Sequence, residues 1–238
     1  MTDTQLDNRI LVGGLGKSGK TTFICSLLNL AKQKGKNFAG FKPFDVGLLE
    51  HNAREEKSDG ELICDFMQGE PMVTLVSPYL AHESYPVELS FRRDGIRIDW
   101  NFINDRMKLL DQLYDKTLIE MPPGLLTSLT EDKMAYQWGK EVSKQVIWMI
   151  RPEQHLLESN LSQINLLQTA GFTIFLVFNN CSKKFDQDLI FYFWEKLEKF
   201  ADQQLEGMIP YFEKPLENLD PFNEKLQENL PTLINYLL

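Results

Sequence analysis

The chain has 238 residues, of which 43% are hydrophobic, and a formal net charge of -9 at pH 7. This hydrophobic content suffices for a sizeable core and excludes the disordered and fibrous classes. Because neutralising nucleic-acid phosphates usually needs a basic face, the acidic balance argues against a nucleic acid partner, although it does not exclude a nucleotide site.

Cysteine usage and hydropathy indicate a cytoplasmic protein. The three cysteines are widely spaced and form no CxxC pair, as expected for reduced thiols in a core. The polar start MTDTQLDNR does not resemble a secretory signal, and no run approaches the length of a membrane span, so we expect no membrane partner. The histidines show no paired metal-ligand spacing. The cysteines are Cys25, Cys64 and Cys181, and the histidines are His51, His82 and His155.

The first predicted elements are a strand, a glycine-rich loop and a helix. The apolar run RILV (residues 9–12) ends at glycines, and residues 21–35 show apolar positions at helical spacing. Between them, Gly14-x-x-x-x-Gly19-Lys20-Thr21 matches the phosphate-loop pattern in its required context. Such a loop surrounds phosphates with backbone N–H groups, while its lysine reaches the outer phosphates and its threonine can bind Mg²⁺. The predicted nucleotide-binding residues are Gly13, Gly14, Gly16, Lys17, Ser18, Gly19, Lys20, Thr21 and Thr22; Lys17 either contacts phosphate or is solvated.

A second strand and a capped helix follow the loop region. The strand is predicted over residues 37–47, with a break at Lys42-Pro43 because proline disfavours continuing a ladder. Ser58 and Glu61 have the spacing of a capping box for a helix through residues 59–69, which places Asp59 in its first turn.

The rest of the chain alternates between predicted helices and strands. A helix over residues 99–116, with an apolar stripe of Phe102, Ile103, Met107, Leu110 and Leu113, leads into a strand that ends at Glu120. Further helices are expected over 131–143, 158–171, 188–203 and 224–238, and strands over 144–150, 172–180 and 207–210. This alternation predicts an α/β, P-loop NTPase-like fold, with a mostly parallel sheet and helices on both faces. With no linker or repeat, residues 1–238 are predicted to form a single domain.

Three residues at predicted element ends are candidates for binding Mg²⁺ and phosphate. Mg²⁺ prefers oxygen ligands, which favours Glu120 first and Asp59 second. A strand end and a helix's first turn also suit carboxylates without any metal. Lys42 belongs to the sheet edge where open α/β folds bind ligands, so it either meets a phosphoryl group or is solvated.

Two other nucleotide-binding classes are disfavoured. Partition-type ATPases carry a signature lysine where this chain has Leu15, and we expect no basic or amphipathic terminal anchor. The guanine signature Asn-Lys-x-Asp is also missing, since residues 179–182 read Asn-Asn-Cys-Ser. ATP is therefore expected rather than GTP.

The order of these motifs resembles the dethiobiotin synthetase family over nearly the whole chain. The family's phosphate loop resembles residues 13–21, its Lys-Pro-x-x-x-Gly resembles residues 42–47, and its Ser-Asp resembles Ser58-Asp59. Later matches are the Pro-Tyr region at 77–79, the strand ending at Glu120, Asn179, and the Gly-x-Ile-Pro run at 207–210.

The resemblance implies an ATP- and Mg²⁺-dependent enzyme of biotin biosynthesis. In that family CO₂ adds to an amine of 7,8-diaminopelargonate, ATP phosphorylates the carbamate, and the second amine closes the ring. A cytoplasmic homodimer with a diaminopelargonate-like small-molecule substrate is implied as well. The implied roles are Mg²⁺ binding by Thr21, Asp59 and Glu120, catalysis by Lys20 and Lys42 through phosphate-charge stabilisation, and adenine contact by Asn179, Pro210 and Tyr211.

The departures from the family fall mainly on the side facing the organic substrate. The family's Thr-x-Thr-x-Val is Leu15-Gly16-Lys17-Ser18 here, its small hydroxyl residue is Val46, and its Glu-Gly-Ala-Gly-Gly turn is Glu120-Met121-Pro122-Pro123-Gly124. Prolines provide neither a donor N–H nor flexibility. Two interpretations stay open: a divergent ligase acting on this or another small amine or acid, or a nucleotide-binding regulatory module that lost this chemistry.

Overall fold

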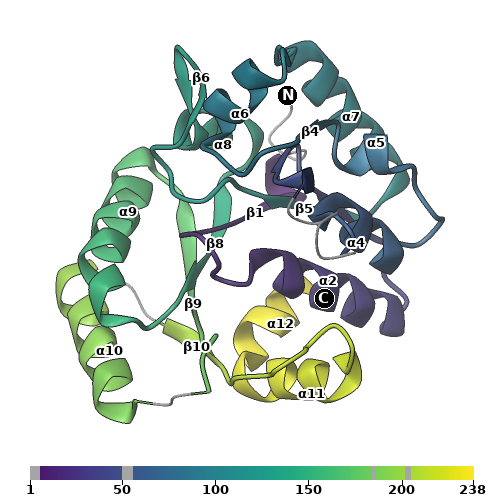
Figure 1. Cartoon of the computed structure of the whole chain (residues 1–238). Helices are drawn as coiled ribbons and strands as arrows, with labels where there is room; N and C mark the ends of the chain where they lie inside the picture. The colour runs from purple at the N-terminus through teal and green to yellow at the C-terminus, as the bar shows by residue number, and fades with distance from the viewer. Residues whose placement is uncertain (1–5, 50–55, 184–185, 202–204) are drawn as a thin grey trace.

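A computed structural model describes residues 6–49, 56–183, 186–201 and 205–238. Within these residues a six-stranded sheet has the order β10-β9-β8-β1-β5-β2, and its neighbouring strands are parallel (Figure 1). The predicted α/β fold with a parallel sheet is thus confirmed. The strands are β1 (Arg9–Gly14), β2 (Phe38–Phe41), β5 (Lys116–Glu120), β8 (Gln145–Ile150), β9 (Thr173–Asn179) and β10 (Leu205–Ile209).

Helices cover both faces of this sheet. The chain steps from β1 towards β2 in one direction and from β8 towards β10 in the other, so right-handed crossovers place their helices on opposite faces. Figure 1 shows α2 (Lys20–Gln33), α11 (Leu219–Asn229) and α12 (Pro231–Leu237) on one side, and α9 (Leu157–Ala170) and α10 (Gln187–Ala201) on the other. A hydrogen bond from Ser26 to Asn223 joins α2 to α11.

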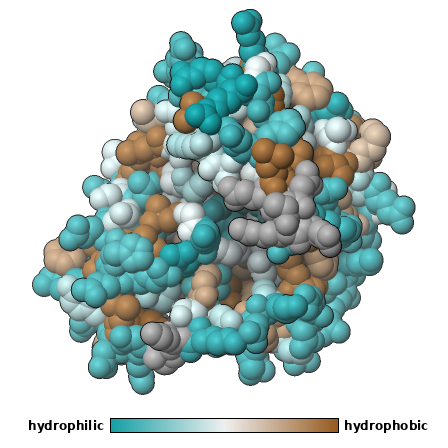
Figure 2. All heavy atoms as spheres, viewed as in Figure 1, coloured by the Kyte–Doolittle hydropathy of each residue, from teal (hydrophilic) through white to brown (hydrophobic). Residues whose placement is uncertain are grey.

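The core lies along the central strands. All six residues of β1 are buried, and so are all of β8 except its first residue. Continuous apolar runs are typical of parallel strands covered on both faces. On the face drawn in Figure 2, hydrophilic residues predominate and the hydrophobic ones form separate patches. No helix among the described residues is long and apolar enough to cross a membrane.

Smaller elements surround the main sheet. β3 (Phe44–Val46) pairs in parallel with β4 (Tyr79–Ala81), and β6 (Ser128–Thr130) pairs antiparallel with β7 (Lys133–Met134). The remaining helices are α4 (Asp59–Phe66), α5 (Val73–Val76), α6 (Val87–Arg93), α7 (Trp100–Leu113), α8 (Ala135–Val142) and the 3₁₀ helix η1 (Gln154–Leu156).

The structure corrects several predicted element boundaries. The strand expected over residues 37–47 is two strands, because the chain leaves the main sheet at Lys42-Pro43. The helix expected from residue 131 begins at Ala135, since residues 133–134 pair with β6 instead. The expected terminal helix is broken before Pro231, whose ring disfavours a helical conformation at Leu230.

Two predictions about packing were also too broad. On α7, Ile103, Met107 and Leu110 are buried as predicted, but Phe102 and Leu113 are exposed. All three cysteines are free thiols; Cys25 is buried, whereas Cys181 is exposed and was wrongly assigned to the core. The expectation that residues 1–238 form one domain stays a prediction.

Candidate nucleotide site

The glycine-rich loop connects the end of β1 to the start of α2. Gly14 and Gly19 both have positive φ angles, 153° and 84°. A Cβ atom on Gly14 would lie 2.5 Å from Ser18 Oγ, and one on Gly19 would lie 2.2 Å from Asn179 Nδ2. The loop conformation therefore requires glycine at both positions, in strand–loop–helix order.

Lys20 is the first residue of α2 and lies within the loop. Its side-chain Nζ donates a hydrogen bond to Leu15 O at 3.2 Å, and the residue is only 6% exposed. Burial lowers the pKa of Lys20, while the nearby carboxylate of Glu120 acts in the opposite direction. With no acidic residue in the first turn of α2, this ammonium and the helix N-terminus present positive charge to an anion.

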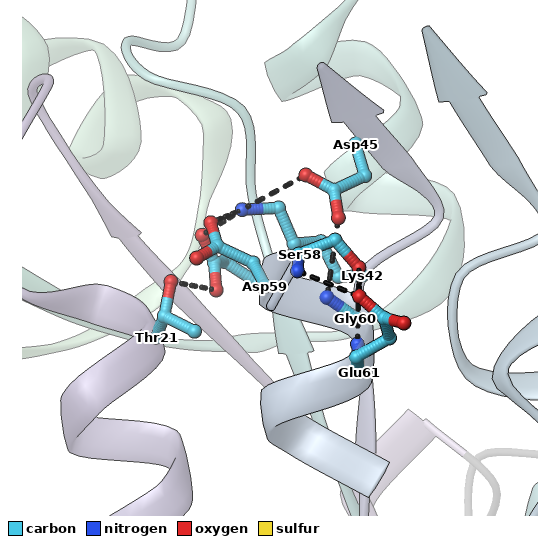
Figure 3. Close-up of polar contacts among 8 residues, drawn as sticks. Thr21, Lys42, Asp45, Ser58, Asp59, Gly60 and Glu61 are labelled. Carbon is cyan, nitrogen blue, oxygen red and sulfur yellow. Dashed lines mark hydrogen bonds and ion pairs between the residues drawn. The ribbon is translucent and has the colours of Figure 1, made fainter. Parts of the chain in front are cut away.

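Four further predicted site residues meet beside the loop, of which Figure 3 labels Thr21, Lys42 and Asp59. Thr21 Oγ1 donates to Glu120 Oε2 at 2.9 Å, and Lys42 Nζ lies 3.0 Å from Glu120 Oε1. Lys42 Nζ also forms an ion pair with Asp59. The end of β5, the residue after β2 and the start of α4 thus converge on one point at the carboxyl edge of the sheet.

The first turn of α4 directs Asp59 towards Lys42. The predicted capping box is confirmed: Ser58 Oγ accepts from Glu61 N at 3.3 Å, and Glu61 Oε2 accepts from Ser58 N at 2.8 Å. This reciprocal pair fixes where the helix begins, and Asp59 is its first residue.

Asp45 on β3 joins the same cluster, although no sequence motif singled it out. It is 1% exposed; its Oδ1 lies 3.6 Å from Lys42 Nζ, and its Oδ2 accepts from Gly60 N at 3.1 Å. Burial raises the pKa of Asp45, while Lys42 opposes that shift. Burial also lowers the pKa of Lys42, but Glu120, Asp45 and Asp59 outweigh it and leave that pKa above its ordinary value.

The charges and donors of this cluster suit a divalent cation. Two lysines and three carboxylates carry a formal charge of 2 - 3 = -1, which alone would repel a triphosphate. No three His, Cys, Asp or Glu side chains form a metal cage in the described part of the chain. The available hydroxyl of Thr21 and carboxylates of Asp59 and Glu120 fit Mg²⁺, which uses few protein oxygens and keeps several waters.

A cavity of about 520 Å³ opens beside this cluster. The loop from Gly16 to Thr22, together with Lys42, Asp59 and Glu120, forms its polar wall. The apolar lining residues, which we call the apolar wall, are Phe44, Val46, Leu62, Val87, Met121, Pro122, Pro123 and Leu216, and Ser84 also lines the cavity. The cavity can therefore hold an anion against one wall and an apolar group against the other.

The residues expected at the adenine lie apart from this cavity. Asn179 Nδ2 donates to Ser18 O at 2.8 Å, so its amide braces the loop. Pro210 and Tyr211 follow β10 and, like Asn179, are not among the lining residues. Gly13 is not a lining residue either; its backbone packs against Trp148. The adenine assignment stays a prediction.

Arg151 is a loop contact that sequence reasoning missed. It follows the last residue of β8, and its Nη1 lies 3.4 Å from both Gly16 O and Lys17 O. Lys17 has a left-handed backbone, with φ 59°. Only the position of Arg151 at the end of a central strand could have suggested this role, because no motif covers it.

The sequence predicts no metal site built from histidines. The described histidines are not among the residues that line the cavity. His82 is exposed and bonded to Asp94 through Nδ1 at 2.9 Å, and His155 is exposed near Glu153. His51 lies outside the described residues.

Comparisons with known proteins agree with the phosphate-loop motif and with the α/β fold. The family model of the AAA domain matches residues 8–217. The chain is 22% identical to the ATP-dependent dethiobiotin synthetase BioD of Bacillus cereus (strain G9842), covering 82% of this chain and 79% of that protein. It is 23% identical to the enzyme of the same name from Mannheimia succiniciproducens, covering 83% and 85%.

Solved structures with the same fold include two P-loop proteins of other names. The septum site-determining protein MinD from Pyrococcus horikoshii, complexed with Mg-ADP, superposes with a TM-score of 0.54 at 17% identity, covering 93% of this chain and 95% of that one. A plasmid partition protein from Borrelia burgdorferi gives 0.54 at 15% identity, covering 98% and 100%. At these identities the likeness shows the fold alone.

Proposed function

The chain belongs to the AAA domain family of P-loop proteins, and on that premise we propose that it is an ATP- and Mg²⁺-dependent ligase of the dethiobiotin synthetase type. Its proposed reaction converts 7,8-diaminopelargonate, CO₂ and ATP to dethiobiotin. The observation that carries this proposal is the convergence of Thr21, Lys42, Asp59 and Glu120 beside the phosphate loop. The similarity to dethiobiotin synthetases over four fifths of the chain supports the choice of reaction.

The proposed roles follow from charge and position. Lys20 would bind the outer phosphates, because its buried ammonium lies inside the loop. Thr21, Asp59 and Glu120 would hold Mg²⁺, which neutralises phosphate oxygens when it is bound. Lys42 would stabilise the phosphoryl group during transfer to the carbamate oxygen. Such a site accelerates phosphoryl transfer chiefly by positioning and charge neutralisation.

Three parts of the proposal rest on the family resemblance. Asn179, Pro210 and Tyr211 would contact the adenine. The protein would act as a homodimer, and it would do so in the cytoplasm.

The first mechanistic steps would be addition of CO₂ to one substrate amine and phosphorylation of the carbamate. Attack by the second amine would then release phosphate and close the ring.

The apolar wall favours a second candidate function, a nucleotide-binding module without this ligase activity. Val46 offers an apolar side chain to the cavity, and Pro122 and Pro123 have no backbone N–H to donate. A carbamate or a diamine needs polar partners when it is removed from water. This wall would suit a different, more apolar small molecule better.

Release of ADP distinguishes the two candidates. The purified protein would be incubated with Mg-ATP and bicarbonate, with and without 7,8-diaminopelargonate. We expect the diamine to stimulate ADP release and dethiobiotin to form. Mg-ATP binding without any stimulation would contradict the ligase and favour the binding module. Rescue of growth in a host that requires biotin would identify the substrate independently.

A further inference from the structure

Asp45 is a buried carboxylate that the proposed reaction does not use directly. It lies in the middle of β3, is 1% exposed, and is not among the residues lining the cavity. A carboxylate taken out of water in this way is stable only when it is paired. Its partners should therefore show what it does.

Its two oxygen atoms have different partners (Figure 3). Oδ1 lies 3.6 Å from the ammonium of Lys42, and Oδ2 accepts from the backbone N–H of Gly60 at 3.1 Å. Gly60 follows Asp59 directly in the first turn of α4. Asp45 therefore contacts both the lysine of the site and the backbone beside one proposed Mg²⁺ ligand.

The start of α4 has little room to move around this contact. A Cβ atom added to Gly60 would lie 2.5 Å from Ser77 Cβ and 3.6 Å from Asp45 Oδ2. The turn is thus held between the segment before β4 on one side and β3 on the other. The hydrogen bond from Gly60 to Asp45 fixes the position of Asp59 within this space.

The three carboxylates around Lys42 are not equivalent. Asp59 and Glu120 border the cavity and would turn to Mg²⁺, whereas Asp45 lies behind them. Once Mg²⁺ engages the first two, Asp45 is the carboxylate of this cluster that still faces the Lys42 ammonium. Without that partner, Lys42 would be repelled by the nearby cation.

We propose that Asp45 is a positioning residue that holds Lys42 at the terminal phosphate and fixes the first turn of α4. This inference rests on the proposed function and concerns the same site. Its consequence is a preference for triphosphate over diphosphate, since only the triphosphate presents a γ-phosphate to Lys42. Loss of Asp45 would reduce that preference without affecting the contacts that the loop makes to the other phosphates.

A double-mutant cycle tests whether Asp45 acts through Lys42. Fluorescent N-methylanthraniloyl derivatives of ADP and of the β,γ-imido triphosphate would be titrated with Mg²⁺ into wild type, Asp45→Asn, Lys42→Ala and the double variant. Asparagine keeps an acceptor for Gly60 but removes the charge. The matched control is Asp65→Asn, because Asp65 is an exposed carboxylate on the same helix, paired with Lys57.

We expect Asp45→Asn to lower the triphosphate preference about tenfold, which is typical of losing one charge-assisted contact, while ADP affinity stays within about twofold. Lys42→Ala should have a similar effect, and the double variant should be no worse than Lys42→Ala alone. Asp65→Asn should match the wild type. In the wild type, amide exchange at Gly60 should stay slow when Mg²⁺ and the imido triphosphate bind, a readout that needs no variant.

Three results would overturn the inference. The first is an unchanged preference in Asp45→Asn, and the second is an effect that multiplies with that of Lys42→Ala. The third is an equal loss of both nucleotides with a lower melting temperature, which would indicate a purely structural role. If the wild type bound neither nucleotide, the proposed function itself would fail, and this inference would fail with it.

Discussion

The two walls of the cavity differ in how their residues depend on one another. On the polar wall, Lys42 contacts two carboxylates, and Thr21 contacts one of the same two. On the apolar wall, residues such as Val46, Pro122 and Pro123 offer no polar side chain to a ligand. A change to a charged residue of the polar wall leaves a buried charge unpaired, whereas a change in the apolar wall leaves these ion pairs intact.

This difference separates two questions about function. The polar wall is built from four segments: the phosphate loop, the end of β5, the residue after β2 and the start of α4. Their charged side chains pair with one another, so this arrangement can be kept while other parts of the sequence diverge. The side that would face the proposed organic substrate depends on Met121, Pro122 and Pro123 and on single side chains such as Val46. The same polar wall can therefore serve different reactions, because fold alone does not determine the reaction.

Lys20→Ala should give the largest effect of any change to the polar wall. The variant loses a buried ammonium that lies inside the loop, so we expect Mg-ADP affinity to fall by about a hundredfold or more. Fluorescence titration with labelled ADP measures it. Lys34→Ala, at the exposed end of the same helix, is the matched control and should bind normally. Unchanged affinity in Lys20→Ala would show that the loop does not hold phosphates.

Gly19→Ala should have the next largest effect, because its new Cβ atom would collide with Asn179 at 2.2 Å. Gly35→Ala is an informative control, since Gly35 also has positive φ, at 70°, but has nothing within 4 Å of the added atom. Backbone strain of about 1–3 kcal/mol is expected in both variants, whereas loss of nucleotide affinity, by about tenfold, is expected only in Gly19→Ala. Melting curves and titrations measure the two effects. Equal affinity in both variants would argue against a role for loop shape.

Nucleotide affinity should fall as the pH rises into the alkaline range. Burial lowers the pKa of Lys20 below its ordinary value of 10.5 in the empty site, and a bound phosphate would raise it again. Binding is then strongest below the lowered pKa and weakens as pH rises towards the pKa of the bound state. Titration at several alkaline pH values in the same buffer salt tests this. Affinity that rises with pH would contradict the assignment of Lys20.

Val46→Ser should have the smallest effect on nucleotide binding and so sharpens the contrast between the walls. The side chain is half-buried, lines the cavity and makes none of the polar contacts of the loop, so Mg-ADP affinity should change by less than about twofold. If the site accepts a carbamate, the added hydroxyl should increase diaminopelargonate-stimulated ADP release. A large loss of ADP affinity would show that the two walls are not independent.

Much of the polar wall could be predicted because parallel strands end at the same edge of a sheet. The phosphate loop followed β1, Glu120 ended β5 and Lys42 followed β2, so their meeting was expected from the topology. The position of Asp59 followed from the capping box of α4. These local rules identify residues whose place is set by one element.

Asp45 and Arg151 could not be found in this way. Asp45 reaches Lys42 only because the chain leaves the main sheet at Pro43 and forms β3 beside β4, a pairing that no local pattern encodes. Arg151 follows β8, and it contacts the backbone of the phosphate loop only because its side chain is long. The break at Pro231 was missed because helical periodicity continues across it, although the proline itself was a signal.

A crystal structure with Mn²⁺ in place of Mg²⁺ and the β,γ-imido analogue of ATP tests the nucleotide site most directly. We expect the triphosphate in the loop, anomalous signal from Mn²⁺ beside Thr21, Asp59 and Glu120, and Lys42 turned from Asp59 and Glu120 to the terminal phosphate while it keeps its contact with Asp45. A triphosphate bound outside the loop, or a metal that contacts none of these three residues, would contradict the proposed site.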